Sequence, residues 1–318
     1  MNADMATADA TGRWIDAVGV RSLSDVRVLR IDGADAQTWL HGQLTANIDA
    51  LGPGESAYGL RVDLKGRVEA DVWVLRAHDA TGALRTLWPA DGFESQLESL
   101  DRFIVMEDVE LAPEPDTRVL TVQGRRAVDA LSAAGAAETA TWPADRFWLG
   151  PGGGFDLLVP AARHDATLAA LVEAAESLGG GRVDAPAWEV ARLRRGVPRF
   201  GRDFGAFTYP QEAGLQRRAV AFDKGCYAGQ EAVVMLEHRG KPPRRLVRIE
   251  MAGGSELEPE TPLFDAAGAK VGWVTSAAFD PDVGCTIGLA LLKRAAALPE
   301  APVRTELGLE ARIVDLCG

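Results

Sequence analysis

The chain has 318 residues, of which 47% are hydrophobic, and it contains 34 glycines and 17 prolines. This length allows a sizeable core and favours two or three domains over one compact unit. The formal net charge of −12 argues against a protein that binds DNA directly or lies on a membrane surface.

The first 13 residues are acidic and contain no apolar segment, so we expect a disordered tail there and no secretion signal. No apolar run in the sequence is long enough to span a bilayer. Cys226, Cys285 and Cys317 are far apart and form no CxxC pair, which argues against a disulfide framework and a structural zinc site. These features predict a cytoplasmic protein without a bound metal.

The N-terminal part shows strand and helix patterns in alternation. Residues 26–31 alternate apolar and polar side chains, which predicts a strand, and residues 34–44 follow as a helix. A hairpin comes next, with arms at 58–63 and 68–75 joined by a charged turn at 64–67. This order indicates an α+β lobe.

Two units of a strand followed by a helix come next, each ended by glycine. The first has a strand at 119–122 and a helix at 127–134, and the second has a strand at 155–159 and a helix at 165–178. Glycine just past a helix supplies the left-handed residue that ends it. This spacing predicts a second α+β lobe with ferredoxin-like split β-α-β topology. No GxGxxG or phosphate-binding loop accompanies these strands, which argues against a nucleotide-binding fold.

The C-terminal part has a different character, with short strand patterns separated by Gly, Pro and Asp. The expected strands are 246–251, 261–264, 269–276, 286–292 and 311–316. Such a series is typical of a small β-barrel. Consecutive prolines near 241–244 mark a boundary. We therefore expect two α+β lobes at 14–241 and a C-terminal β-barrel at 244–318.

The most informative segment is KGCYAGQE at 224–231. It sets Lys224 and Cys226 on either side of one glycine, and a nearby cation favours the thiolate, which is the reactive form of cysteine. Glycines allow a tight turn and close approach of a ligand. The alternative is a tight turn that holds a buried, inert cysteine.

Further short motifs surround this segment in a fixed order. They are HGQLTAN at 41–47, DLKGR at 63–67, RRGVP at 194–198, PQEA at 210–213, RG at 239–240 and VGWVTS at 271–276. Together with KGCYAGQE, they resemble the YgfZ-type folate-binding proteins, relatives of the glycine-cleavage T-protein. The resemblance implies a three-lobed T-protein-like architecture with two α+β lobes and a C-terminal β-barrel.

The resemblance also implies tetrahydrofolate or a derivative as cofactor, and support of iron–sulfur enzymes, including those that thiomethylate tRNA, as function. The partners would be iron–sulfur client enzymes, and we expect a monomer. One thiol cannot hold a cluster with the usual four-cysteine ligation, so a cluster role requires a partner. Whether Cys226 ligates a cluster, forms a mixed disulfide or attacks a folate-borne carbon stays open at this point.

The expected site residues follow from these motifs. Cys226 and Lys224 are the expected catalytic residues. The expected cofactor-binding residues are Gln43, Thr45, Asp63, Lys65, Arg67, Tyr227, Gln230, Glu231 and Arg239. Between Arg192 and Arg248 there are 13 Lys and Arg against 5 Asp and Glu, which suits a ligand with carboxylates such as folate.

Several of these residues also have a purely structural interpretation. Gln43 and Thr45 can end the first helix, and the charged turn at 64–67 can be a solvated hairpin tip. Tyr227 fits better as a flat wall than as a catalyst. Tryptophans such as Trp73 and Trp188 are expected in the core.

Departures from the T-protein pattern bear on the reaction. T-proteins carry an N-A-x-N-x-x-K-D-type segment whose Asp is central to aminomethyl transfer, and Gln96 falls at that place here. An amide cannot take up the proton that a carboxylate can. Asp91 or Glu94 could substitute only in a shifted alignment. Two rival functions remain: a folate-dependent aminomethyl- or methyltransferase, and direct tRNA binding through the basic region.

Overall fold

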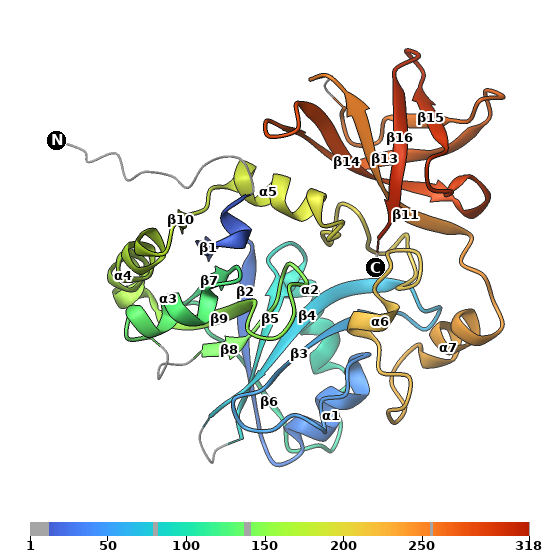
Figure 1. Cartoon of the computed structure of the whole chain (residues 1–318). Coiled ribbons are helices and arrows are strands. Elements are labelled where there is room, and N and C mark those ends of the chain that lie inside the picture. The colour runs from blue at the N-terminus through green and yellow to red at the C-terminus, as the bar shows by residue number, and fades with distance from the viewer. Residues whose placement is uncertain (1–12, 79–81, 137–140, 255–256, 318) are drawn as a thin grey trace.

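The computed structural model describes residues 13–78, 82–136, 141–254 and 257–317. These residues form two five-stranded sheets, each with helices, and a closed β-barrel (Figure 1). The predicted α+β class with a C-terminal barrel is confirmed. Of the predicted tail at 1–13, only Arg13 is described, where it begins a short 3-10 helix, Arg13–Asp16.

The first sheet is antiparallel, with its strands in the order β3-β4-β5-β2-β6. The strands are β2 (Val26–Asp32), β3 (Ser56–Val62), β4 (Val68–Arg76), β5 (Leu84–Pro89) and β6 (Glu110–Pro113). The expected strand, helix and hairpin of this lobe are all present. Helices α1 (Ala36–Gln43) and α2 (Phe93–Asp101) supply Trp39, Leu40 and Leu100 to a core shared with the sheet.

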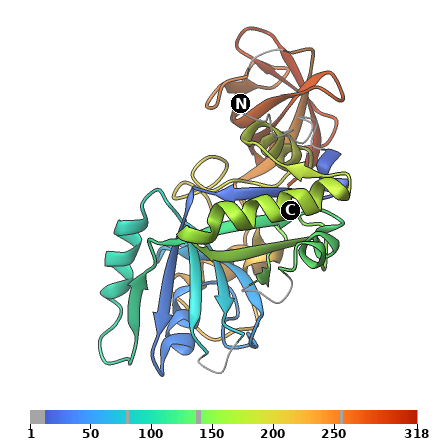
Figure 2. The same cartoon turned by 90° about the vertical axis from the view of Figure 1, so that its left-hand side faces the viewer.

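The second sheet has the strand order β10-β1-β7-β9-β8. The strands are β1 (Gly19–Leu23), β7 (Thr117–Gln123), β8 (Thr141–Pro143), β9 (Gly154–Pro160) and β10 (Gly181–Arg182). Its helices are α3 (Ala127–Ala133) and α4 (His164–Ser177), with a short 3-10 turn at Ala161–Arg163. In α4, Leu168, Leu171, Val172 and Ala175 are buried at helical spacing, and this apolar face packs against the sheet (Figure 2).

The two lobes are interleaved along the chain. Strand β1 belongs to the second sheet, yet only Ser24 and Asp25 separate it from β2 in the first sheet. The chain completes the first lobe before it returns to β7, which pairs with β1 in antiparallel register. The link between β1 and β2 therefore crosses the space between the two sheets.

The barrel closes in the order β11-β14-β13-β12-β15-β16. Its strands are β11 (Arg244–Ala252), β12 (Pro262–Phe264), β13 (Lys270–Asp280), β14 (Cys285–Lys293), β15 (Pro302–Thr305) and β16 (Glu310–Leu316), with a 3-10 turn at Arg294–Ala296. The five expected strands are present. The sequence did not predict β15, which is short and begins with a proline.

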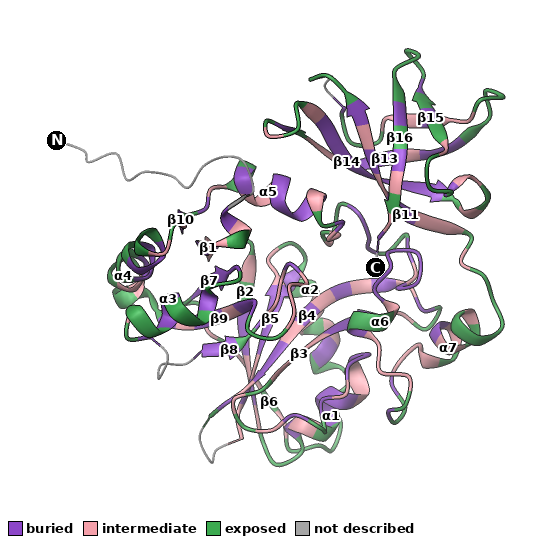
Figure 3. Ribbon diagram, in the orientation of Figure 1, coloured by how far each residue is buried: buried purple, intermediate pink, exposed green. Residues whose placement is uncertain are grey.

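Helix α5 (Ala185–Arg194) lies between the second lobe and the barrel, with buried residues on two faces (Figure 3). Asp184 begins it by accepting a hydrogen bond of 2.8 Å from the Ala187 backbone N–H. Ala187 packs with Phe147 of the second lobe, whereas Leu193 packs with the barrel. The remaining helices are α6 (Gln216–Ala219) and α7 (Gln230–His238). No helix in the described part of the chain is long and apolar enough to cross a membrane.

One buried carboxylate connects α5, the following loop and the barrel. Asp203 Oδ2 accepts hydrogen bonds from the Arg192 guanidinium at 2.7 Å and the Arg199 backbone N–H at 2.8 Å. Its Oδ1 accepts hydrogen bonds from the hydroxyls of Thr275 and Ser276 on β13, at 2.5 and 2.8 Å. The VGWVTS motif of the barrel thus supplies hydrogen bonds to the rest of the molecule.

We expect Asp203→Ala to lower the free energy of unfolding by about 3–5 kcal/mol, because it removes one partner of a buried ion pair. Urea unfolding followed by tryptophan fluorescence measures the change. Glu173→Gln on the exposed face of α4 is the matched control and should change stability by less than about 0.5 kcal/mol. Equal stability of Asp203→Ala and the control would show that this carboxylate does not hold the barrel in place.

Candidate functional site

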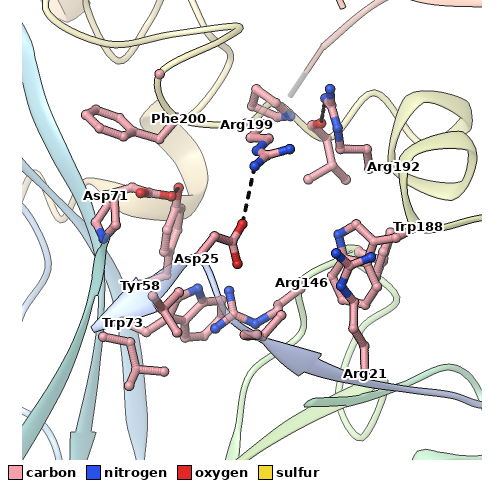
Figure 4. Close-up of a pocket in the computed structure, with 18 of the residues that line it drawn as sticks. Arg21, Asp25, Tyr58, Asp71, Trp73, Arg146, Trp188, Arg192, Arg199 and Phe200 are labelled. Carbon is pink, nitrogen blue, oxygen red and sulfur yellow. Dashed lines mark hydrogen bonds and ion pairs between the residues drawn. The ribbon is translucent and has the colours of Figure 1, made fainter. Parts of the chain in front are cut away.

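A cavity of about 710 Å3 lies between the two sheets, α5 and the segment at 197–201 (Figure 4). Its volume falls within the range of small-molecule sites. The residues that line it include Arg21, Asp25, Tyr58, Asp71, Trp73, Trp88, Asp91, Arg146, Trp148, Trp188, Arg192, Arg199, Phe200 and Arg218.

Aromatic rings form two ends of this cavity. At one end, Tyr58 of β3 and Trp73 of β4 are cross-strand partners with ring centroids 5.2 Å apart. At the other end, Trp188 of α5 packs edge-on against Phe147 at 4.5 Å. Figure 4 shows Trp73 and Trp188 on opposite sides of the view. Flat apolar surfaces of this kind stack with planar ring systems.

Arginines surround these rings. Arg218 lies over the ring of Trp148 at 4.3 Å, and Arg21 lies over Trp188 at 5.4 Å. Arg146 lies over the ring of Trp73 at 5.4 Å. Its guanidinium also forms a bidentate ion pair with the buried Asp156, with N–O distances of 2.5 and 3.1 Å. The cavity therefore offers positive charge that suits carboxylates or phosphates.

An ion pair crosses the cavity between its two ends. Arg199 lies 3.4 Å from Asp25 of the β1–β2 link, and Figure 4 shows this contact in the middle of the view. Both side chains are about half exposed, so the pair contributes little to stability, on the order of 0–1 kcal/mol. An anionic ligand can therefore take the place of Asp25 at Arg199 at small cost.

A protonatable carboxyl group lies at the aromatic end. Asp71 and Trp73 are on the same face of β4, and Tyr58 donates a hydrogen bond of 3.1 Å from its hydroxyl to Asp71 Oδ2. Burial raises the pKa of Asp71 to about 6, against the opposing effects of Tyr58 and Arg146. Perturbed carboxyl groups in cavities are typical of ligand-binding or catalytic sites.

The signature segment 224–231 lies elsewhere, at the C-terminal end of α1. The Lys224 ammonium donates hydrogen bonds to the backbone carbonyls of His41, Leu44 and Ala46, at 2.5, 2.6 and 2.9 Å. Burial lowers the pKa of Lys224 to about 8. Cys226 is exposed. The Lys224 ammonium thus stabilises the end of α1 through hydrogen bonds to backbone carbonyls, a role that the sequence did not reveal.

Two glycines allow the signature and the hairpin turn to pack together. Gly229, at the N-terminus of α7, has a φ of +79°, and a Cβ there would meet the Asp63 carbonyl oxygen at 2.1 Å. Gly66 has a φ of +77° and lies against Ala232 of α7. The positive φ favours glycine at both positions, and at Gly229 the close backbone approach leaves no room for a side chain. They explain why the motifs at 63–67 and 224–231 occur together.

The other expected site residues are distributed around this junction. Thr45 is buried: its hydroxyl donates to the Ala219 carbonyl and accepts from the Leu60 N–H at 2.8 Å. Asp63 Oδ1 accepts the backbone N–H groups of Lys65 and Arg67, both at 2.8 Å.

The remaining residues of the set divide into paired, buried and exposed groups. Arg67 bonds to Glu212 at 3.3 Å, and Tyr227 packs in a core cluster. Gln43 and Gln230 are half-buried. The exposed residues of the set are Lys65, Cys226, Glu231 and Arg239.

The relatives of this chain agree with its motifs. The tRNA-modifying protein YgfZ of Yersinia pseudotuberculosis serotype O:1b is 30% identical over 263 residues, which is 79% of this chain and 74% of that protein. YgfZ of Sodalis glossinidius is 29% identical over 252 residues, 74% of each chain. The chain belongs to the YgfZ family.

Two further likenesses concern the fold of this YgfZ-family chain. Residues 244–317 match the glycine cleavage T-protein C-terminal barrel domain. The glycine cleavage system aminomethyltransferase T of Bartonella henselae has a TM-score of 0.83, covering 98% of this chain and 90% of that one, at 19% identity. At this identity the likeness shows a shared T-protein fold and nothing about activity.

The YgfZ signature and the cavity are separate places in this chain. None of the eleven expected site residues lines the 710 Å3 cavity. Gln96 does not line it either: its Oε1 accepts a hydrogen bond of 2.6 Å from Arg61. Asp91, by contrast, does line the cavity. In the described part of the chain, no group of three or more His, Cys, Asp and Glu residues could hold a metal ion.

Trp73 and Trp188, which were expected in the core, are half-buried: each packs against a core cluster and also lines the cavity. Strand alternation was the signal that could have placed Asp71 and Trp73 on one face of β4, because residues two apart in a strand point to the same side. Trp188 had no comparable signal, because its position depends on how α5 packs between the lobes.

We expect Asp71→Asn to stabilise the protein at pH 7.5 by about 1–3 kcal/mol. The carboxyl binds its proton more tightly in the folded state, with a pKa of about 6, than at its usual 3.8. The protonated Asp71 carboxyl therefore stabilises the folded state at pH 4, and this contribution is lost as the pH rises through 6.

Urea unfolding at pH 4.5 and pH 7.5 measures this difference, and the gain should be small at pH 4.5. Asp91→Asn, which changes an exposed carboxylate of the same cavity, is the control and should alter stability by less than about 0.5 kcal/mol. Loss of stability of Asp71→Asn at pH 7.5 would contradict the assignment of a costly buried charge.

Proposed function

We propose that this chain is a tetrahydrofolate-binding member of the YgfZ family that supports iron–sulfur enzymes, including enzymes that modify tRNA, through the thiol of Cys226. The observation that carries the folate part is the combination of aromatic rings, a half-buried carboxyl with a raised pKa and arginines in one cavity of about 710 Å3. The family supports the functional part, since its curated relatives are named tRNA-modifying proteins.

The residues of the cavity fit the chemistry of a reduced folate. Such a ligand has a flat heterocycle with hydrogen-bond donors, a benzoyl ring and a glutamate tail with carboxylates. The Tyr58–Trp73 pair suits the heterocycle, and Asp71 beside it can accept hydrogen bonds from the heterocycle's N–H groups. Arg199 and Arg218 suit the carboxylates. A bound reduced folate supplies a carrier for one-carbon units.

The exposed thiol suits a second molecule that arrives from solvent. Cys226 is exposed, whereas Cys285 is half-buried and Cys317 is buried, and burial raises the pKa of both of these thiols. A thiol with a raised pKa reacts slowly near neutral pH. Cys226 is therefore the cysteine that a client enzyme can reach. We propose iron–sulfur enzymes as these clients, with this chain acting as a monomer.

We expect the purified chain to bind tetrahydrofolate in calorimetric titration, and Arg218→Ala to weaken binding. Loss of a charge-assisted hydrogen bond costs about 1.5–3 kcal/mol, which corresponds to roughly a 10- to 100-fold rise in Kd. Arg218 is exposed to the cavity, so its removal leaves the core intact.

Arg239→Ala is the matched control, because Arg239 belongs to the expected site residues but does not line the cavity. Weaker binding with Arg239→Ala and unchanged binding with Arg218→Ala would show that the ligand binds near Arg239 and not in the cavity. No binding of any folate form would overturn the proposal.

A second candidate function is folate-dependent aminomethyl or methyl transfer. The observation in its favour is that carboxyl groups do line the cavity, and Asp71 and Asp91 are two of them. Against it, Gln96 occupies the place of the T-protein carboxylate in the sequence and bonds to Arg61. The two functions therefore differ in whether Asp71 or Asp91 serves as an acid–base group.

We expect the chain to lack glycine-cleavage activity in a reconstituted system with the lipoyl carrier. Removal of a positioned acid–base group costs about 10²–10⁴-fold in rate. Full activity that disappears in Asp71→Asn or Asp91→Asn would establish the transferase instead.

A further inference from the structure

One aromatic residue of the cavity has a strained backbone. Trp148, in the loop between β8 and β9, lines the cavity and has a φ of +58°, which is in the left-handed region. A bulky residue rarely adopts this conformation, because its Cβ comes too close to a carbonyl oxygen. The other described non-glycine residues with positive φ, Glu260 and Glu300, lie in exposed turns of the barrel. Strain of this kind persists only where the surrounding contacts impose it, and it is concentrated at ligand-binding sites.

Two charged side chains impose the conformation of Trp148. The Asp145 carboxylate accepts hydrogen bonds from the backbone N–H groups of Leu149 and Gly150, at 2.8 and 2.7 Å. On the other side, the guanidinium of Arg195, which follows α5, donates a hydrogen bond of 2.9 Å to the Trp148 carbonyl oxygen. The loop is therefore held at Trp148 and at the two residues after it. The RRGVP motif, which contains Arg195, thus contributes to the wall of the cavity.

The ring of Trp148 supports an arginine that has no other partner. Arg218 of α6 lies over the indole at 4.3 Å, and it is exposed to the cavity. The other four arginines of the cavity, all labelled in Figure 4, each bond to a protein oxygen: Arg21 to the Asp184 carbonyl, Arg146 to Asp156, Arg192 to Asp203 and Arg199 to Asp25. Arg218 forms no hydrogen bond or ion pair with any residue in the described ranges of the chain. Its donors are therefore available to a ligand.

The charged groups around Arg218 leave it positive. Burial lowers its pKa, Asp145 opposes this effect and Arg195 adds to it. Asp145 and Arg195 already bond to the backbone of the loop, and neither takes up the Arg218 donors. An arginine stays charged even when its pKa is lowered in this way. Its planar guanidinium presents N–H groups that match the two oxygens of a carboxylate. The contact with the indole ring uses the charge and not these donors.

We propose that Trp148 is a positioning residue for Arg218: its strained backbone places the indole ring where it holds the guanidinium in the cavity to bind a carboxylate of the ligand. The ligand class is then a compound whose aromatic part fits between the rings of the cavity and whose carboxylate reaches Arg218. Binding to a guanidinium that is already held in place loses less conformational freedom, which raises affinity. The inference rests on the proposed function for the identity of the ligand, and the positioning of Arg218 does not depend on it.

The first test compares calorimetric binding of tetrahydrofolate with that of its diamide, in which both glutamate carboxylates are replaced by carboxamides. In Trp148→Gly we expect the Kd for tetrahydrofolate to rise about 3- to 30-fold, the range that corresponds to loss of one cation–π contact. The Kd for the diamide should change little, because a carboxamide has no charge to pair with Arg218. Trp148→Phe keeps a flat aromatic ring and should retain most of the wild-type preference for tetrahydrofolate.

Leu149→Ala is the matched control, because Leu149 belongs to the same loop but does not line the cavity. It should leave both Kd values unchanged. An equal rise of both Kd values in Trp148→Gly would overturn the inference, since it would show that the ring does not act through the charge of Arg218.

The second test needs no ligand. In the wild-type protein the NMR signal of the Arg218 Nε–H, assigned by its loss in Arg218→Lys, should be shifted upfield by the ring current of Trp148. Trp148→Gly should return this signal to the position of an ordinary exposed arginine. An unchanged Arg218 signal in Trp148→Gly would overturn the inference. Failure of the wild-type protein to bind tetrahydrofolate would overturn the proposed function alone, because this comparison still decides whether Trp148 positions Arg218.

The strain itself is measured by urea unfolding of Trp148→Gly and Trp148→Ala, which lack the same ring. Glycine adopts a positive φ without strain, whereas alanine does not. The glycine variant should therefore have the higher unfolding midpoint. An equal or lower midpoint for Trp148→Gly would show that the backbone at this position is not strained, and would contradict the role assigned to it.

Discussion

The buried carboxylate of Asp203 is the constraint on which the arrangement of the three parts depends. It accepts four hydrogen bonds, from Arg192, Arg199, Thr275 and Ser276. A buried carboxylate is tolerated only when such bonds compensate its lost hydration. Those bonds are possible in one relative position of α5, the loop at 197–205 and the barrel.

This position has consequences for the cavity. Arg192 and Arg199 both line it, and both bond to Asp203. The barrel therefore contributes to the cavity indirectly, through the hydroxyls of Thr275 and Ser276.

The sequence predicted the local structure well because local structure follows from periodicity and from turn chemistry. The hairpin at 58–75, the helices ended by Gly135 and Gly179, and five barrel strands were all expected and are present. Motif order also predicted the family. The interleaving of the lobes was not predictable, because β1 carries only five residues and its partners are more than 90 residues away.

The candidate site likewise has one part that the sequence could predict and one part that it could not. The signature residues are recognisable because glycine, lysine and cysteine at fixed spacing are a rare pattern. The residues of the cavity come from strands β1 to β5, helices α5 and α6 and several loops. Each of them alone has the composition of an ordinary core or surface position. Only the tertiary contacts bring Tyr58, Asp71 and Trp188 around one space. The cavity was therefore beyond the reach of sequence patterns, with the exception of the Asp71–Trp73 pair.

Two separate sites on one T-protein scaffold are the central feature of this account: a cavity for a small ligand and an exposed thiol for an external partner. Lys224, Gly229 and Gly66 build the second site from backbone contacts, with no residue in common with the first. A chain arranged in this way can bind its cofactor and present its thiol independently.

A crystal structure of the chain with tetrahydrofolate tests this account most directly. We expect density for the ligand between Trp73 and Trp188, with Arg199 released from Asp25 and the loop at 224–229 unchanged. Density for the ligand against Cys226 and Arg239, with the cavity free of it, would contradict the account.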